Sequence, residues 1–152
     1  MKLTENFTLA ELTKSETAEK NNIDNTPDAE QVECLKQLCE NILQPLRDDF
    51  QKPLVISSGF RSKKLSLLVG SKTTSQHCKG QAIDVDDTFG FKTNAEMFEW
   101  IRENLEFDQM IWEFGDDKNP DWIHVSYVGK ISNRNKCLKA YKENGKTKYT
   151  TI

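Results

Sequence analysis

Apolar side chains recur at helical spacing between residues 27 and 50 and predict one long amphipathic helix. Pro27 suits the first turn of this helix, because a proline there gives up no intrahelical hydrogen bond. Pro45 lies inside the pattern, so we expect it to kink the helix or to restart it. The apolar stripe consists of Ala29, Val32, Leu35, Cys39, Ile42, Leu43, Leu46 and Phe50.

Two capping boxes mark shorter helices. Thr8 and Glu11 can each accept a hydrogen bond from a free backbone N–H at a helix start, and Thr93 and Glu96 repeat the pattern. Residues 62–69 predict one or two helical turns, whereas the polar residues 20–27 predict a loop.

Short β-branched or alternating segments predict strands at residues 54–58, 82–86, 109–114 and 122–128. A final hairpin is expected from residues 138–141 and 148–152, which flank an Asn-Gly turn. Because the helices come first and most strands can pair antiparallel, the order predicts an α+β fold with N-terminal helices packed on a mostly antiparallel sheet. We expect residues 1–152 to form one domain.

Composition narrows the possible functions. The 152 residues are 36% hydrophobic, which favours a folded chain. Their net charge of −3 disfavours a protein whose main function is to bind nucleic acid. We see no apolar stretch that could serve as a signal peptide or membrane anchor, so we expect cytoplasmic synthesis and no stable membrane association. The segment from Lys130 onward contains seven basic residues and one acidic residue. We interpret this tail as a solvated edge hairpin, with attraction to a polyanionic surface as the alternative.

The two histidines of the chain, His77 and His124, lie in segments that suit a metal site. His77 precedes the predicted strand that contains Asp84, and Gly80 allows a tight turn between them. His124 lies on a strand that can pair alongside. Two histidines and one carboxylate can bind zinc and leave a position for water, as a hydrolase requires. Cys78 should point away from His77 and is not expected to be a ligand.

A zinc hydrolase also needs a base for the attacking water and a cation for the developing oxyanion. Asp121, three residues before His124 at the end of a loop, is the first candidate base. Arg61 follows a strand and a glycine turn, and its planar fork suits a carbonyl oxygen or a carboxylate.

Three ordered segments resemble a known family of zinc peptidases. The pattern Ser75-x-His77-x-x-Gly80-x-Ala82-x-Asp84 is similar to the zinc motif of D-alanyl-D-alanine carboxypeptidases and L-alanyl-D-glutamate endolysins. Residues 58–62 and 121–124 resemble the family's arginine segment and its second metal segment. The resemblance spans at least residues 57–127 and implies a fold like that of the Hedgehog signalling domain.

The resemblance implies Zn²⁺ as the cofactor and peptidoglycan stem peptides as the substrate. It assigns His77, Asp84 and His124 as metal ligands, Arg61 as the oxyanion or carboxylate contact, and Ser75 as a hydrogen-bonding residue near the substrate.

Many members carry Glu where this chain has Asp121, and Asp is one methylene shorter. Glu113, at the end of the preceding strand, is therefore the second candidate base.

These residues leave several functions open. We expect a monomeric phage or prophage endolysin that is made in the host cytoplasm and reaches the cell wall after release. The residues do not separate a D,D-carboxypeptidase from an L-Ala-D-Glu endopeptidase. The alternatives are a non-catalytic binding module that keeps the metal as a structural staple, and a virion scaffold protein in which both histidines are structural.

Overall fold

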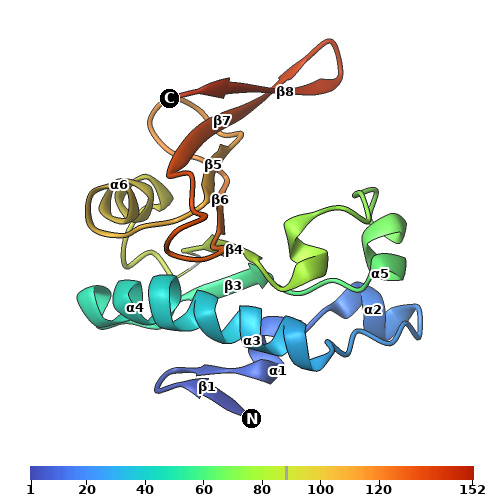
Figure 1. Cartoon of the computed structure of the whole chain (residues 1–152). Coiled ribbons are helices and arrows are strands. Elements are labelled where there is room, and N and C mark those ends of the chain that lie inside the picture. Colours follow the sequence, from blue (N-terminus) through green and yellow to red (C-terminus); the bar gives the residue numbers. More distant parts are fainter. Residues whose placement is uncertain (88) are drawn as a thin grey trace.

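The N-terminal part of the computed structural model consists of short elements around one long helical segment (Figure 1). The model describes residues 1–87 and 89–152. Thr8 caps the first helix in the predicted capping box, with Glu11 as its partner. The first elements are β1 (Lys2–Thr4), β2 (Phe7–Thr8), α1 (Leu9–Thr13) and α2 (Glu16–Lys20).

The predicted long helix forms as α3 (Ala29–Leu38), η1 (Cys39–Leu43) and α4 (Gln44–Phe50). The central segment η1 is a π-helix, in which the Gln44 N–H bonds to the Cys39 carbonyl five residues back. Pro45 stands in the first turn of α4. Because proline cannot donate to the preceding turn, the wider π-turn admits it without ending the helical path.

Six strands form the main sheet in the order β3-β4-β6-β5-β7-β8. All neighbouring pairs are antiparallel except β5 and β7, which run parallel. This arrangement confirms the predicted α+β class with a mostly antiparallel sheet. The strands are β3 (Val55–Ser58), β4 (Ala82–Asp86), β5 (Gln109–Glu113), β6 (Trp122–Ser126), β7 (Lys136–Glu143) and β8 (Lys146–Thr151).

The remaining helices are α5 (Lys63–Leu68), the 3₁₀ turn η2 (Gln76–Lys79) and α6 (Asn94–Asn104). Figure 1 shows α6 beside β5 and β6, and the α3–η1–α4 segment running along β3. Phe98 of α6 meets Trp112 of β5 edge to face, with ring centroids 5.4 Å apart. One cluster of buried side chains joins α6 and the α3–η1–α4 segment to one face of the sheet, where it includes Ile83 and Ile123. The opposite face of the sheet carries the side chains of the candidate functional site.

Three elements were not predicted from the sequence: the β1–β2 pair, the separate helix α2 and the turn η2. Each has five residues or fewer, so hydrophobic periodicity has too few positions to reveal it. The C-terminal hairpin is longer than predicted, because its polar Lys136 and Lys146 also pair in the ladders. In the described part of the chain, no helix has the length and apolar character needed to cross a membrane.

Candidate metal centre and active-site cleft

Strand register brings Asp84 and His124 together. Asp84 on β4 lies directly opposite His124 on β6, and His124 is in turn opposite Ile111 on β5. Residues directly opposite on paired strands project from the same face of a sheet. The face that carries Asp84 and His124 is therefore the one opposite the core residues Ile83 and Ile123.

The turn η2 brings His77 to the same point. Ser75 caps this turn by accepting a hydrogen bond from the His77 N–H at 3.2 Å. Gly80 ends it with φ of 73°, and a Cβ at this position would lie 2.5 Å from the Gln31 carbonyl oxygen. Only glycine therefore lets the turn pack this closely on α3 and continue directly into β4.

The three side chains converge with their donor atoms inside 4.8 Å of one another. Asp84 Oδ1 lies 3.4 Å from His77 Nε2 and 3.2 Å from His124 Nδ1. His77 Nδ1 lies 2.8 Å from the Gly59 carbonyl oxygen. Since a carbonyl can only accept, Nδ1 carries the proton and Nε2 keeps its lone pair for a ligand.

This donor set fits a zinc ion. Zinc bonds of about 2.0–2.1 Å to nitrogen or oxygen in tetrahedral geometry place ligand atoms about 3.3 Å apart. The two Asp84–histidine distances agree with that spacing. The three residues line a cleft of about 730 Å³, which would leave room for a water molecule beside a bound ion. The predicted ligands thus form a metal-ligand-like cluster of the open kind that hydrolases use.

The neighbours of Asp84 stabilise the ionised form of its carboxyl group. Burial opposes ionisation of this carboxyl group, but the contacts with His124 and His77 outweigh burial and leave its pKa lower than usual. An ionised carboxylate between two imidazole nitrogens is the form that binds a divalent cation.

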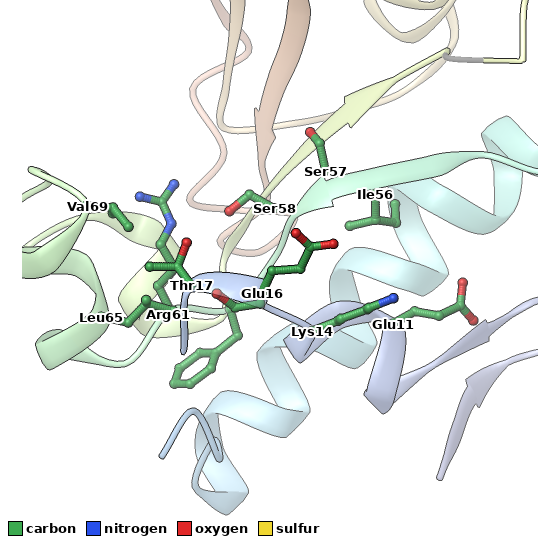
Figure 2. Close-up of a pocket in the computed structure, with 12 residues that line it drawn as sticks. Glu11, Lys14, Glu16, Thr17, Ile56, Ser57, Ser58, Arg61, Leu65 and Val69 are labelled. Carbon is green, nitrogen blue, oxygen red and sulfur yellow. The ribbon is translucent and has the colours of Figure 1, made fainter. Parts of the chain in front are cut away.

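Arg61 stands at the edge of the cluster. Its Nη2 lies 3.8 Å from Asp84 Oδ2, and its backbone N–H donates to the His77 carbonyl at 3.2 Å. Its Nε is buried without a hydrogen-bond partner among the described residues. The same side chain lines a second cavity of about 640 Å³ (Figure 2). In that view Arg61 and Val69 lie at one end of the cavity, and Lys14 and Glu11 at the other.

Glu113 lies in the same cleft as the three metal-site residues. It occupies the position two residues after Ile111 on β5, so its side chain leaves the sheet on the face of His124. Burial raises the pKa of Glu113 to about 7, with His124 acting to lower it and the Asp84 carboxylate acting to raise it. A carboxyl group with a pKa near 7 suits a general base that works at neutral pH.

Asp121 lies elsewhere. It is exposed and lines a different cavity together with Asp86 and Asp87. Its carbonyl accepts from the Asn94 side chain, and its N–H donates to the Glu113 carbonyl. The strand β6 begins at Trp122, and residues three apart in an extended chain point to opposite faces. The structure therefore does not place Asp121 beside His124, the position expected of it, and places Glu113 in the cleft.

Several cleft-lining residues were not identified from the sequence, among them one cation and one tyrosine. Arg134, before β7, and Tyr149, on β8, both face the cleft that holds His77 and His124. Burial raises the pKa of the Tyr149 hydroxyl, and the charge of Glu113 raises it further. The parallel pairing of β5 with β7 carries the C-terminal hairpin to this side of the molecule. No local pattern in the sequence predicts the pairing of β5 with β7.

Comparisons with known proteins agree with this geometry. The family model described as peptidase M15 matches residues 5–126, a span that includes the three metal-site residues, Arg61 and Glu113. None of the curated proteins compared with the chain matches it.

Proposed function

The chain belongs to the peptidase M15 family of metallopeptidases, and on that premise we propose that it hydrolyses peptide bonds in peptidoglycan stem peptides with a zinc ion held by His77, Asp84 and His124. The observation that carries the proposal is the convergence of these three side chains at the floor of a cleft that also contains Glu113 and is bordered by Arg61.

Each residue has a distinct task. When bound, zinc supplies Lewis acidity that polarises the scissile carbonyl and makes water easier to deprotonate. The Glu113 carboxylate takes the proton of the attacking water and later delivers it to the leaving amine. The Arg61 guanidinium stabilises the oxyanion that develops on the carbonyl, or holds a substrate carboxylate. The Gly59 carbonyl keeps His77 in the tautomer that can bind the ion.

The substrate class rests on the resemblance of residues 57–127 to D-alanyl-D-alanine carboxypeptidases and L-alanyl-D-glutamate endolysins. We extend the proposal to a monomeric phage or prophage endolysin, made in the host cytoplasm and released to the cell wall. Both types of bond, D-Ala–D-Ala and L-Ala–D-Glu, fit the same set of catalytic residues.

The test is mass spectrometry of a defined muropeptide after incubation with the zinc-loaded protein and with Glu113→Gln. Loss of a terminal D-Ala would identify a carboxypeptidase, and separation of L-Ala from D-Glu an endopeptidase. A wild-type protein that binds zinc and muropeptide but releases no product would support the non-catalytic binding module instead.

A further inference from the structure

A bidentate ion pair borders the cleft on the side away from Glu113. Arg134 Nε and Nη2 donate to the two carboxylate oxygens of Asp108, each at 2.9 Å, and the Arg134 backbone N–H adds a third bond at 3.2 Å. Asp108 is only 3% exposed, whereas the Arg134 side chain is 54% exposed. The pair therefore has a fixed buried half and an open outer edge.

The same carboxylate connects Arg134 to the metal-site turn. Gln76, the residue before His77, donates to Asp108 Oδ2 at 2.9 Å. The backbone N–H of Asp108 donates to the Ser126 carbonyl at 2.8 Å. Asp108 is thus saturated by neighbours from three parts of the chain, and the guanidinium that it holds has little freedom. A donor fixed in advance loses little entropy when a ligand binds to it.

Charges in the cleft point to an anionic ligand. Its lining includes three cationic side chains, Arg61, Lys72 and Arg134. Its acids are the metal-site residue Asp84 and the proposed base Glu113. The chain as a whole has a net charge of −3, so the cationic lining departs from the average of the molecule. A bound zinc ion would offset the charges of Asp84 and Glu113, which leaves the cations of the lining to attract an anionic ligand.

The sheet also sets the distance between Arg134 and the candidate metal site. Asp108 is hydrogen-bonded to Ser126, which lies two residues along β6 from His124. An extended chain rises about 3.3 Å per residue, so the pair lies about two to three peptide residues from the metal ligand.

We propose that the outer N–H groups of Arg134 bind a carboxylate of the peptide substrate that lies beyond the two residues flanking the cleaved bond. The inference rests on the proposed peptidase function and names a specificity determinant separate from Arg61. Arg134 would therefore select stem peptides whose carboxylate is free over those in which it is amidated.

The experiment uses acetyl-L-Ala-γ-D-Glu-L-Lys-D-Ala-D-Ala in which the D-Glu α-carboxylate or the C-terminal carboxylate is amidated one at a time. The relevant carboxylate is the α-carboxylate of D-Glu if the D-Ala–D-Ala bond is cleaved, and the C-terminal one if the L-Ala–D-Glu bond is cleaved. Amidation of that carboxylate should lower the wild-type kcat/KM about 10- to 100-fold, the range of a hydrogen-bonded charge. In Arg134→Gln the same amidation should change kcat/KM less than about threefold. Arg134→Lys, which keeps the charge but loses the fork, should show an intermediate penalty.

Arg102→Gln is the matched control, because Arg102 lies on α6 and pairs with Glu99 away from the cleft. It should keep the full wild-type penalty. Equal amidation penalties in wild type and Arg134→Gln would overturn the inference. So would a uniform loss on all peptides accompanied by loss of zinc, since that result indicates a purely structural ion pair.

Calorimetric titration of the same peptides separates this inference from the proposed function. A wild-type protein that cleaves nothing but binds the free carboxylate at least tenfold more tightly than the amide, with the preference lost in Arg134→Gln, would refute only the peptidase. Equal binding of the two peptides by wild type would refute the role of Arg134, whether or not cleavage occurs.

Discussion

Asp84 and His124 occupy directly opposite positions on β4 and β6, and their Oδ1 and Nδ1 atoms lie 3.2 Å apart. The backbone ladder between these strands therefore sets the separation of two of the three candidate metal ligands. A ligand pair built on rigid strands is organised before the ion arrives. Only His77 depends on a turn for its position.

Zinc should bind stoichiometrically and stabilise the fold. Because the ion binds the folded protein, about 100-fold excess over Kd raises the free energy of unfolding by about 2.7 kcal/mol. His77→Ala should abolish this gain, whereas Cys78→Ala, a change of the adjacent buried residue, should preserve the zinc affinity. Metal analysis and thermal melting with and without zinc provide the measurement. Equal zinc affinity of His77→Ala and wild type would contradict the assignment.

Exchange of the two candidate bases separates their roles. Glu113→Gln should lower kcat on stem peptides by about 10²–10⁴-fold, since a general base contributes that much to rate. Asp121→Asn should stay within about threefold of wild type, because Asp121 lines another cavity. Both variants should retain one zinc per chain. A large loss in Asp121→Asn with Glu113→Gln active would restore Asp121 as the base.

The pH profile should report the base. Burial raises the pKa of Glu113 to about 7, and the group must be ionised to accept a proton. Activity should therefore fall about tenfold per pH unit below the apparent pKa. A bound divalent cation favours the carboxylate and should move this midpoint below 7. The acidic limb should vanish from the residual activity of Glu113→Gln, and a limb that persists there would belong to another group.

Without metal, the same carboxyl group should affect stability with the opposite trend. Its pKa in the folded state lies above its ordinary value of 4.5, so the folded chain binds the proton more tightly than the unfolded chain does. The free energy of unfolding should therefore decrease as pH rises from about 4.5 to 7. Urea unfolding of metal-free wild type and Glu113→Gln across this window would show whether the variant loses the dependence.

Two of the three candidate metal ligands could be predicted from local information. His77, Gly80 and Asp84 lie within eight residues, and the tight turn and the strand that join them follow from short-range rules. The base could not be settled in the same way. The start of β6 at residue 122 was predicted, but choosing between Asp121 and Glu113 also required the pairing of β5 with β6, which puts Glu113 on the face of His124.

Two other parts of the cleft lining depend on contacts between distant parts of the chain. Arg134 and Asp108 are 26 residues apart, and Gln76 joins the same carboxylate from a further 32 residues away. The parallel pairing of β5 with β7 brings Tyr149 to the site through its neighbour β8. Hydrophobic periodicity reports the period of an element but not its partner, so none of these contacts could be predicted from it.

Gly80 offers a test of how tightly the metal-site turn is tied to the helices. Gly80→Ala must accept a positive φ, and its Cβ would lie 2.5 Å from the backbone oxygen of Gln31. Gly145→Ala is the matched control, since Gly145 has φ of 77° but open space around it. A left-handed alanine alone costs about 1–2 kcal/mol. Gly80→Ala should cost about 3 kcal/mol or more, because backbone must also move.

Urea unfolding and zinc titration of the two variants give the comparison. Gly145→Ala should keep the wild-type zinc affinity, because Gly145 lies in the turn of the C-terminal hairpin. Gly80→Ala should bind zinc more weakly, since displacement of η2 from α3 moves His77 away from Asp84 and His124. Equal destabilisation of the two variants with unchanged zinc affinity would mean that the turn adjusts freely, and that His77 is not held in place by its packing on α3.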